Sequence, residues 1–405
     1  MRQNILLEEA QELLLNYCPQ TEKKNISLSD ALGRVLGEDV KARESIPPFD
    51  RSPYDGYAFR AEDTQNATKE NPTTLKVIEE VAAGHVPQNK VVKGQAVKIL
   101  TGAPIPEGAN AVIKYEETEL KGNFISIHGP VKPGENVVPA GEDVTRGEII
   151  ASRGTVITSP VMGLMAALGI TRASVYQCPR IAIVSTGDEL LDISEPLALG
   201  KIRNSNSYTL KGYIRTIGAD PVMIGTARDN TEEVAFLIEQ GLERADMVIT
   251  TGGVSVGDYD LVRNAVEYIG AETLYWRIRI KPGSPTLAAC KNGKVILGLS
   301  GNPAAAMVVF QLLTIPYIKK MAGRKNYLHE EIAVVLKKDF QKASPCRRFL
   351  RGKLVFENGM TFMDTTGSQG NGILHSMIGC NVLAEIPEGS GPVQAGEKLT
   401  AYLVE

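Results

Sequence analysis

Five short loops in the middle of the sequence carry glycines, hydroxyls, carboxylates and one lysine, and each follows an apolar run that is typical of a strand. In chain order they are Ser185–Glu189, Arg228–Asn230, Thr250–Asp260, Lys281–Pro285 and Ser300–Pro303. Ligands of open parallel sheets bind beyond the carboxyl ends of the strands, where loops from neighbouring strands converge. The sequence therefore predicts a binding site at one edge of a sheet.

The residue types in these loops suit a phosphorylated ligand accompanied by a hard divalent cation. Gly252 and Gly253 allow backbone N–H groups to approach phosphate oxygens, and a helix that starts after such a loop adds a favourable dipole. Lys281 supplies a positive charge for an anion. Carboxylates can hold Mg²⁺, which prefers oxygen ligands, and the loops offer Asp188, Glu189, Asp229 and Asp260.

Each loop also has a purely structural interpretation. Asp188 could cap a helix, and Asp229 with Asn230 has the form of another N-cap. Lys281–Pro285 alone is typical of a turn. The Gly252-Gly253 pair matches neither GxxxxGK[ST] nor GxGxxG. The presence of all five loops at one sheet edge favours a site.

The alternation of strands and helices from Arg180 onward predicts a multidomain α/β plus β protein with a central doubly wound, mostly parallel sheet. The expected division has four parts. They are a helical linker domain of residues 1–26 and 148–178 (also about 45–53), a β-rich inserted domain of residues 27–147, the α/β domain of residues 179–324, and a small β-domain of residues 325–405.

The composition excludes several classes of function. A net charge of −3 argues against a nucleic-acid partner. The first residues carry acids within their apolar pattern, and no apolar run is long enough to span a bilayer, so we expect a cytoplasmic protein with no membrane contact. Five scattered cysteines without a CxxC pair, and four separate histidines, argue against a disulfide frame, a zinc site and a Ser-His-Asp triad.

Outside the α/β domain, four segments contain residues that could contribute to a site. Asp55 lies in "IPPFDRSPYDGYAF", Thr101 in "ILTGAPIPEGANAVI", Asp143 in "VVPAGEDVTRGE" and Arg351 in "CRRFLRG". On their own the first three are typical of turn-rich loops and the last of a solvated basic face.

Together these segments resemble the molybdopterin molybdenumtransferase family. The resemblance rests on "FDRSPYDGYAFR", "ILTGAPIPEGANAVI", "AGEDV", "VSTGDEL", "ITTGGVSVGDYD", "IKPGSP" and "LSGNPAA", which occur in the family's order over nearly the whole chain. The resemblance makes residues 179–324 the molybdopterin-binding domain.

The resemblance implies an enzyme for the last step of molybdenum cofactor synthesis. The substrates would be adenylylated molybdopterin and molybdate, and Mg²⁺-dependent cleavage of the phosphoanhydride would release AMP as molybdenum enters the dithiolene. It also implies a homodimer, whose site lies between the sheet domain of one subunit and the "DGY" region of the other. Transient contacts with molybdopterin-supplying enzymes and apo-molybdoenzymes would follow from such a role.

The family's functional positions fall on particular residues of this sequence. The catalytic set that the resemblance implies is Asp55, Thr101, Asp143, Asp229, Asp260, Lys281 and Arg351. The substrate-binding set is Gly252, Gly253, Ser255, Arg277, Ser284, Ser300, Asn302 and Pro303. The metal set is Asp188, Glu189 and Asp229.

Three positions depart from the family pattern. Many members have lysines where this chain has Arg277 and Ser284, and a proline in place of Ser300. A guanidinium is a planar fork and an ammonium a point charge, so the exchange at Arg277 alters geometry. The alternatives are therefore a tungstate-preferring paralogue, a non-catalytic cofactor carrier or scaffold on the same fold, and a molybdopterin adenylyltransferase. The last is disfavoured because it needs neither flanking β-region.

Overall fold

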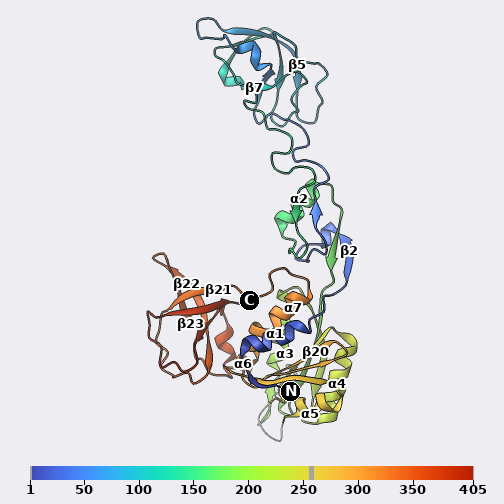
Figure 1. Ribbon diagram of the computed structural model, residues 1–405, viewed down its shortest axis with the longest axis vertical. Coiled ribbons are helices and arrows are strands. Elements are labelled where there is room, and N and C mark those ends of the chain that lie inside the picture. The colour runs from blue at the N-terminus through green and yellow to red at the C-terminus, as the bar shows by residue number, and fades with distance from the viewer. Residues whose placement is uncertain (1, 255–259, 405) are drawn as a thin grey trace.

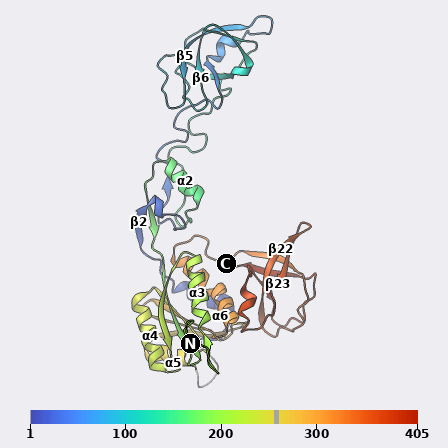
Figure 2. The same cartoon turned by 180° about the vertical axis from the view of Figure 1, so that it is seen from behind.

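The chain forms an elongated molecule, here described by a computed structural model that covers residues 2–254 and 260–404 (Figure 1). A large α/β unit (residues 2–16 and 180–321) lies at one end and a distal unit (residues 56–127) at the other. A narrow stalk (residues 23–41 and 149–176) joins them, and a C-terminal unit (residues 331–403) lies beside the α/β unit, as the reverse view also shows (Figure 2).

The α/β unit is built on a seven-stranded sheet. Its strands, in spatial order, are β1 (Arg2–Ile5), β17 (Glu272–Ile278), β19 (Leu287–Lys291), β20 (Lys294–Leu299), β16 (Met247–Thr251), β12 (Arg180–Thr186) and β15 (Asp220–Ala227). β19 runs antiparallel to both neighbours, and the other adjacent pairs are parallel. The predicted mostly parallel sheet is confirmed.

Helices cover both faces of this sheet, which confirms the doubly wound arrangement. One face carries α1 (Leu7–Asn16), α3 (Ser205–Thr216), α6 (Pro303–Val309), the π-helical η4 (Phe310–Thr314) and α7 (Ile315–Met321). The other carries α4 (Thr231–Arg244) and α5 (Leu261–Tyr268). Side-chain oxygens of Asn204 and Asn230 accept from N–H groups in the first turns of α3 and α4, which fixes where these helices begin.

The helix formed by α6, η4 and α7 is the most apolar element of the chain. Within the described residues it is the one helix long and apolar enough to cross a bilayer, but 89% of its most apolar window is buried inside the protein. It packs between the sheet and helices α1 and α3. Its composition is therefore accounted for by its place in the core.

The first sixteen residues join the α/β unit, although we expected residues 1–26 to form part of a linker domain. β1 pairs in parallel with β17. Leu7, Ala10 and Leu14 of α1 are buried in the same core as the sheet. The apolar face of this amphipathic helix thus packs on the α/β unit, with α7 and η4 as its nearest helical neighbours.

The stalk is made of two antiparallel strand pairs and short helices. Its elements are β2 (Lys23–Ser27) with β11 (Arg172–Tyr176), β3 (Val40–Lys41) with β10 (Ile149–Ala151), α2 (Ser159–Ala167) and the 3₁₀ turn η1 (Leu28–Asp30). Leu36, Val40, Ile157 and Val175 share its core. Residues 28–42, which we expected to open the inserted domain, therefore pack within the stalk.

The distal unit is a six-stranded sheet. Its order is β7 (Ala111–Lys114), β4 (Gly56–Phe59), β6 (Gln95–Ile99), β5 (Thr73–Val81), β9 (Phe124–Ile127) and β8 (Thr118–Lys121), with the turns η2 (Ala61–Thr64) and η3 (Tyr115–Glu117). Alternate residues of these strands are buried on its two faces, Phe59 on one and Ala58 on the other.

The C-terminal unit is a small sheet that closes on itself. Its order is β18 (Ile280–Lys281), β22 (Arg347–Glu357), β23 (Met360–Thr365), β21 (Glu331–Leu336), β25 (Lys398–Leu403) and β24 (Val382–Ile386), with η5 (Leu374–Met377). An additional β22–β24 pairing closes the ring. β18 leaves the α/β unit to pair with β22, so the two units are joined by main-chain hydrogen bonds. A last short pair, β13 (Leu190–Leu191) and β14 (Ile202–Arg203), lies outside these sheets.

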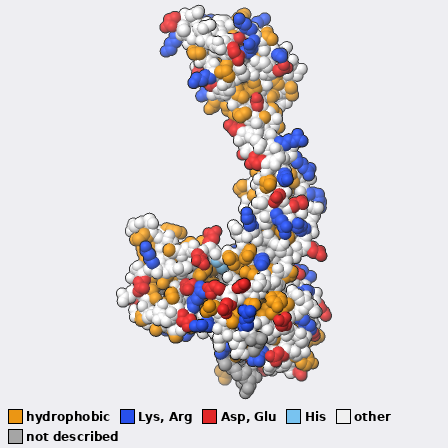
Figure 3. All heavy atoms as spheres, viewed as in Figure 1, with side chains coloured by type: hydrophobic (Ala, Val, Ile, Leu, Met, Phe, Trp, Pro, Cys, Tyr) orange, Lys and Arg blue, Asp and Glu red, His pale blue; other side chains and the backbone are white. Residues whose placement is uncertain are grey.

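Charged side chains cover the visible face of the molecule without forming one large field. Lys and Arg gather along the stalk, while acidic and basic side chains alternate over the α/β unit (Figure 3). This distribution agrees with a net charge of −3.

The packing of α1 yields a test of its place in the fold. We expect Leu14→Ala to lower the free energy of unfolding by about 2–5 kcal/mol, because a buried leucine leaves a cavity when truncated. Leu14 is 1% exposed and Leu6 is 43% exposed, so Leu6→Ala is the matched control. Urea denaturation followed by tyrosine and tryptophan fluorescence measures both. Equal effects of the two variants would contradict the assignment of α1 to the α/β core.

Candidate functional site

A cavity of about 690 Å³ lies at the carboxyl edge of the large sheet. Seven of the residues predicted for the site line it: Glu189, Asp229, Gly252, Gly253, Ser300, Asn302 and Pro303. They come from the loops that follow β12, β15, β16 and β20. Pro285, from the predicted loop Lys281–Pro285, also lines it, so the structure brings all five predicted loops to one cavity.

Glycines form the part of this cavity where the loops approach most closely. Gly252 has φ +89, and a Cβ on it would lie 2.4 Å from the carbonyl oxygen of Thr186. A Cβ on Gly301 would lie 3.4 Å from Cα of Gly252. No side chain fits at Gly252, so main-chain groups line the cavity there.

The cavity also receives the amino end of the long helix that begins at Pro303. Pro303 occupies the first turn, where a missing N–H costs nothing. The side chain of Asn302 makes no capping bond. The main-chain N–H of Asn302 donates to Oγ of Ser300 at 3.2 Å. The helix dipole at this end favours a negative charge.

A hydroxyl network behind the glycines fixes the ends of β12 and β16. Asn204 Nδ2 donates to Ser185 Oγ at 2.8 Å, and Ser185 Oγ lies 3.4 Å from Thr251 Oγ1. Thr186 Oγ1 donates to the carbonyl oxygen of Thr251 at 3.4 Å. Because Asn204 also caps α3, one side chain aligns two strand ends and a helix.

The three carboxylates of the predicted metal set lie close together but are used differently. Glu189 and Asp229 line the cavity, whereas Asp188 Oδ1 accepts from the N–H of Asp229 at 3.2 Å. Within residues 2–254 and 260–404, no group of three or more His, Cys, Asp or Glu side chains could hold a metal ion unaided. Mg²⁺ commonly takes one or two carboxylates and completes its shell with water and substrate phosphate, and the pair Glu189 and Asp229 fits that mode.

Asp260 is buried at the start of α5, where it caps the helix by accepting from the N–H of Arg263 at 3.4 Å. Burial raises the pKa of this carboxyl, and the neighbouring Arg263, Trp276 and Arg277 oppose that rise. Arg277 does not line the cavity and has a positive φ of 68°. Ser255, also predicted for the site, lies outside the described residues.

Lys281 and Ser284 line a second, smaller cavity of about 300 Å³. Pro285 borders both cavities, and Asn371 and Gly372 line the smaller and the larger one respectively. Lys281 thus lies in a different cavity from the glycines. Pro285, at the end of the Lys281 loop, and residues 371–372 of the C-terminal unit lie between the two cavities.

Arg351 is fully buried in β22, so the interpretation of its segment as a solvated basic face does not hold for this residue. Its Nε donates to Ser376 Oγ at 2.7 Å, and its Nη2 donates to the carbonyl oxygens of Ser368 and Gly370. Burial lowers the pKa of this guanidinium to about 10, so it remains charged at neutral pH. Its Nη1 is buried and has no hydrogen-bond partner. Arg351 therefore holds the loop of residues 368–372, which lines both cavities. Its Nη1 group remains as a donor without a partner among the described residues.

Asp55, Thr101 and Asp143 lie away from these cavities within one chain. Asp55 immediately precedes β4, so it belongs to the distal unit, at the other end of the stalk (Figure 1). Asp55 Oδ1 accepts from both the N–H and Oγ1 of Thr101 at 2.7 Å, and these hydrogen bonds lower the pKa of Asp55. The N–H of Asp143 donates to the carbonyl oxygen of Ile46 at 2.9 Å.

Several residues that line the main cavity were not predicted: Thr186, Gly187, Ile202, Val254, Leu261, Pro285, Gly301 and Gly372. Most are immediate neighbours of predicted residues. Gly372 is different, because it comes from the C-terminal unit. The glycine-rich stretch "TGSQGNG", residues 366–372, was the available signal for a loop that approaches another main chain.

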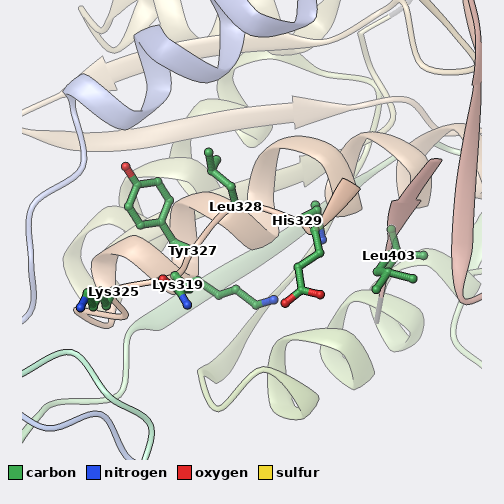
Figure 4. Close-up of a pocket in the computed structure, with 9 residues that line it drawn as sticks. Lys319, Lys325, Tyr327, Leu328, His329 and Leu403 are labelled. Atoms are coloured by element: carbon green, nitrogen blue, oxygen red, sulfur yellow. The ribbon is translucent and has the colours of Figure 1, made fainter. Parts of the chain in front are cut away.

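Another cavity, of about 740 Å³, lies elsewhere. Figure 4 shows Lys319, Tyr327, Leu328, His329 and Leu403 around it. It adjoins the carboxyl end of α7, whereas Pro303 at the other end of the same helix lines the glycine-lined cavity. A helix of this length spans roughly 28 Å, so the two cavities are well separated.

Comparisons with known proteins cover the whole chain. Residues 5–169 match the MoeA N-terminal region (domain I and II), residues 182–320 a probable molybdopterin binding domain, and residues 333–404 the MoeA C-terminal region (domain IV). A molybdopterin molybdenumtransferase of Staphylococcus epidermidis is 36% identical over 405 residues, with 100% of this chain and 96% of the relative covered. One of Bacillus subtilis is 35% identical over 407 residues, with 100% and 95% covered.

A solved structure of similar shape is the molybdopterin biosynthesis moeA protein of Pyrococcus horikoshii. Its TM-score is 0.85 at 34% identity, and 99% of this chain and 100% of that chain are covered. The similarity thus extends over all four units.

The fold and the site together define a transferase of molybdenum cofactor biosynthesis with a molybdopterin-binding α/β unit. The chain belongs to the molybdopterin molybdenumtransferase family. It is an enzyme that inserts molybdenum into molybdopterin, as predicted from its motifs, and the comparisons lend no support to a scaffold or a tungstate-preferring paralogue.

The close approach at Gly252 yields a test of the cavity. We expect Gly252→Ala to lower the melting temperature and to abolish most transfer activity, because its methyl group would overlap Thr186 and push the loop into the cavity. The matched control is Gly270→Ala: Gly270 has φ +70 but no atom within 4 Å of an added Cβ. The control should lose about 1–2 kcal/mol of stability from backbone strain and keep its activity. An active Gly252→Ala variant would contradict the proposed role of this loop.

Proposed function

We propose that the enzyme takes adenylylated molybdopterin and molybdate as substrates, cleaves the phosphoanhydride with Mg²⁺, and releases AMP as molybdenum enters the dithiolene. The observation that carries this proposal is the glycine-lined cavity, where Gly252, Gly253 and the amino end of α6 meet. Main-chain N–H groups donate hydrogen bonds to phosphate oxygens, and a helix dipole stabilises their negative charge. A ligand joined through phosphate to a nucleotide fits such a cavity.

The carboxylates at the rim support a role for Mg²⁺. Glu189 and Asp229 would hold the ion together with phosphate oxygens of the substrate, and Asp188 would keep the Asp229 main chain in place through its 3.2 Å hydrogen bond. When bound, the ion would offset negative charge on the departing phosphate. Asp260, buried at the start of α5, would keep this helix in position.

The smaller cavity supports a neighbouring oxyanion site. Molybdate is a dianion, and Lys281 lines this cavity while Arg351 lies buried behind the loop at its wall. The free Nη1 of Arg351 is a buried donor that an oxyanion could satisfy after a small movement of that loop. Pro285 lines both cavities, so an oxyanion bound in the smaller one would lie next to the organic substrate.

The position of Asp55 and Thr101 supports a homodimer. The distal unit carries this hydrogen-bonded pair far from the cavity of its own chain (Figure 1). A second copy could bring its Asp55 to the cavity, so that each site draws on both chains. Asp143, near the stalk end of the distal unit, would belong to the same contributed surface.

We place this reaction in the cytoplasm, where five free cysteines would stay reduced. Transient contacts with the enzymes that supply molybdopterin and with apo-molybdoenzymes would protect a labile product.

The reaction is tested by incubating the protein with adenylylated molybdopterin, molybdate and Mg²⁺, and measuring AMP and molybdenum bound to the pterin. We expect both products, and we expect EDTA to stop AMP release until Mg²⁺ is restored. Asp229→Ala should reduce turnover more than substrate binding, because it removes a ligand needed for the chemistry. Absence of AMP under all these conditions would overturn the proposal.

Mixed variants test the contribution of the second chain. Asp55→Asn and Asp229→Asn should each be inactive alone. Mixing them after subunit exchange should restore about a quarter of the wild-type sites, because half of the dimers are then mixed and each mixed dimer has one intact site. AMP release by the mixture measures this recovery. Failure to recover activity, with exchange verified by mass spectrometry, would contradict a site shared between chains.

A further inference from the structure

Trp276 is the only tryptophan in the sequence and contacts two arginines from different elements. Its ring centroid lies 4.7 Å from Cζ of Arg277, the next residue of β17, and 5.6 Å from Cζ of Arg263 in α5. Tryptophan is the side chain that attracts a cation most strongly over its ring. One indole therefore links the last part of a strand to the first turn of a helix.

The same indole faces the buried carboxylate of Asp260. The Trp276 N–H and the Arg277 charge both favour the ionised form of Asp260, while burial raises its pKa. Trp276 Nε1, Asp260 Oδ2 and Arg277 Nε are all buried, and none of them has a hydrogen-bond partner among residues 2–254 and 260–404. A buried polar atom without a hydrogen bond costs free energy. Its presence in a native protein therefore calls for a structural or functional explanation.

The cluster formed by Trp276, Asp260, Arg263 and Arg277 is connected to the proposed phosphate-binding loop at Gly253 by a main-chain hydrogen bond. Asp260 and Arg263 belong to the first turn of α5, and the N–H of Val262 in that turn donates to the carbonyl oxygen of Gly253 at 3.1 Å. Leu261, between them, lines the glycine-lined cavity. A shift of this turn would therefore shift Gly253.

The cluster is also connected to the loop that carries Lys281, because Arg277 directly precedes that loop in the chain. Arg277 has φ +68, and its N–H donates to the carbonyl oxygen of Thr286 at 2.8 Å. These features turn the chain out of β17 into residues 278–285, which line the smaller cavity. The side chain of Arg277 rests on Trp276, so the ring supports the base of this loop.

We propose that Trp276 is a positioning residue of the transfer reaction, which sets the distance between the phosphate-binding loop at Gly253 and the oxyanion loop at Lys281. Its ring holds Arg277 and Arg263, and its buried N–H lies near Asp260, so that both loops are anchored on one rigid side chain. Two substrates that react with each other need this distance to be constant. The inference rests on the proposed function for its activity readout, but its contacts belong to the protein alone.

The kinetic test compares Trp276→Phe, Trp276→Leu and wild type. Phenylalanine keeps a ring and loses the N–H, and leucine loses both. We expect kcat for AMP release and molybdenum insertion to fall about ten-fold in the first and roughly 100-fold in the second, with KM changed much less, because misplacement of reacting groups acts on the chemical step. Tyr268→Phe, at a residue of α5 that is 68% exposed, is the control and should keep wild-type kcat. Wild-type kcat in both folded tryptophan variants would overturn the proposal.

The pH profile separates positioning from a loss of general stability. Asp260 is faced by Arg263 from its own helix and by Trp276 and Arg277 from β17. Removing the indole N–H takes away one group that favours the carboxylate, so the pKa of Asp260 should rise further in Trp276→Phe. The acidic limb of kcat should then move to higher pH, whereas an unmoved limb would contradict the contact with Asp260.

Fluorescence tests the contact without any activity. Because Trp276 is the only tryptophan, we expect its emission in wild type to change in one step as Asp260 titrates, and this step to be absent in Asp260→Asn. Identical pH dependence of the two proteins would overturn the proposed contact. If wild type released no AMP, the proposed function would fail while this measurement still decided the contact.

Discussion

The close packing of the loop at Gly252 against the end of β12 and the loop at Gly301 is the constraint on which the rest of the site depends. A methyl group at Gly252 would overlap the Thr186 carbonyl, so the three loops meet through main-chain atoms. Gly252, Gly253 and the amino end of α6 therefore line one cavity. The strand ends must stay aligned for this contact, and the bonds from Asn204 to Ser185 and from Thr186 to Thr251 keep them so.

Two arginines of β22 join the C-terminal unit to this arrangement. Arg347 of β22 bonds both Glu8 of α1 and, at 2.6 Å, Glu385 of β24. Arg351, further along β22, holds the loop whose Asn371 accepts from the N–H of Ala305 in α6 at 3.1 Å. The wall between the two cavities is thus supported by a unit that is remote in sequence. Arg351 is fully buried, so removing the groups that bind it would leave an uncompensated buried charge, and this part of the contact resists change.

The loops at the carboxyl edge could be predicted because each follows a continuous apolar run, and parallel strands present such loops together. Other features depend on contacts between distant segments, which periodicity does not reveal. "TLAACK" was not recognised as a strand, although β19 is the antiparallel member of the sheet. Gly372 and the burial of Arg351 follow from the folding back of the C-terminal unit. The motif around Asp55 resembles a site motif of the family. Within a single chain, however, Asp55 lies in the distal unit, away from the cavities.

The central claim is that the glycine-lined cavity binds the phosphates of adenylylated molybdopterin. The most direct measurement is a crystal structure of the enzyme with that compound bound. The N–H of Gly252 already donates to the carbonyl oxygen of Leu299, so we predict phosphate oxygens within about 3 Å of the N–H of Gly253, as expected for a hydrogen bond. Phosphates bound instead in the cavity of Lys319 and Tyr327, with the glycine-lined cavity unchanged, would contradict the account.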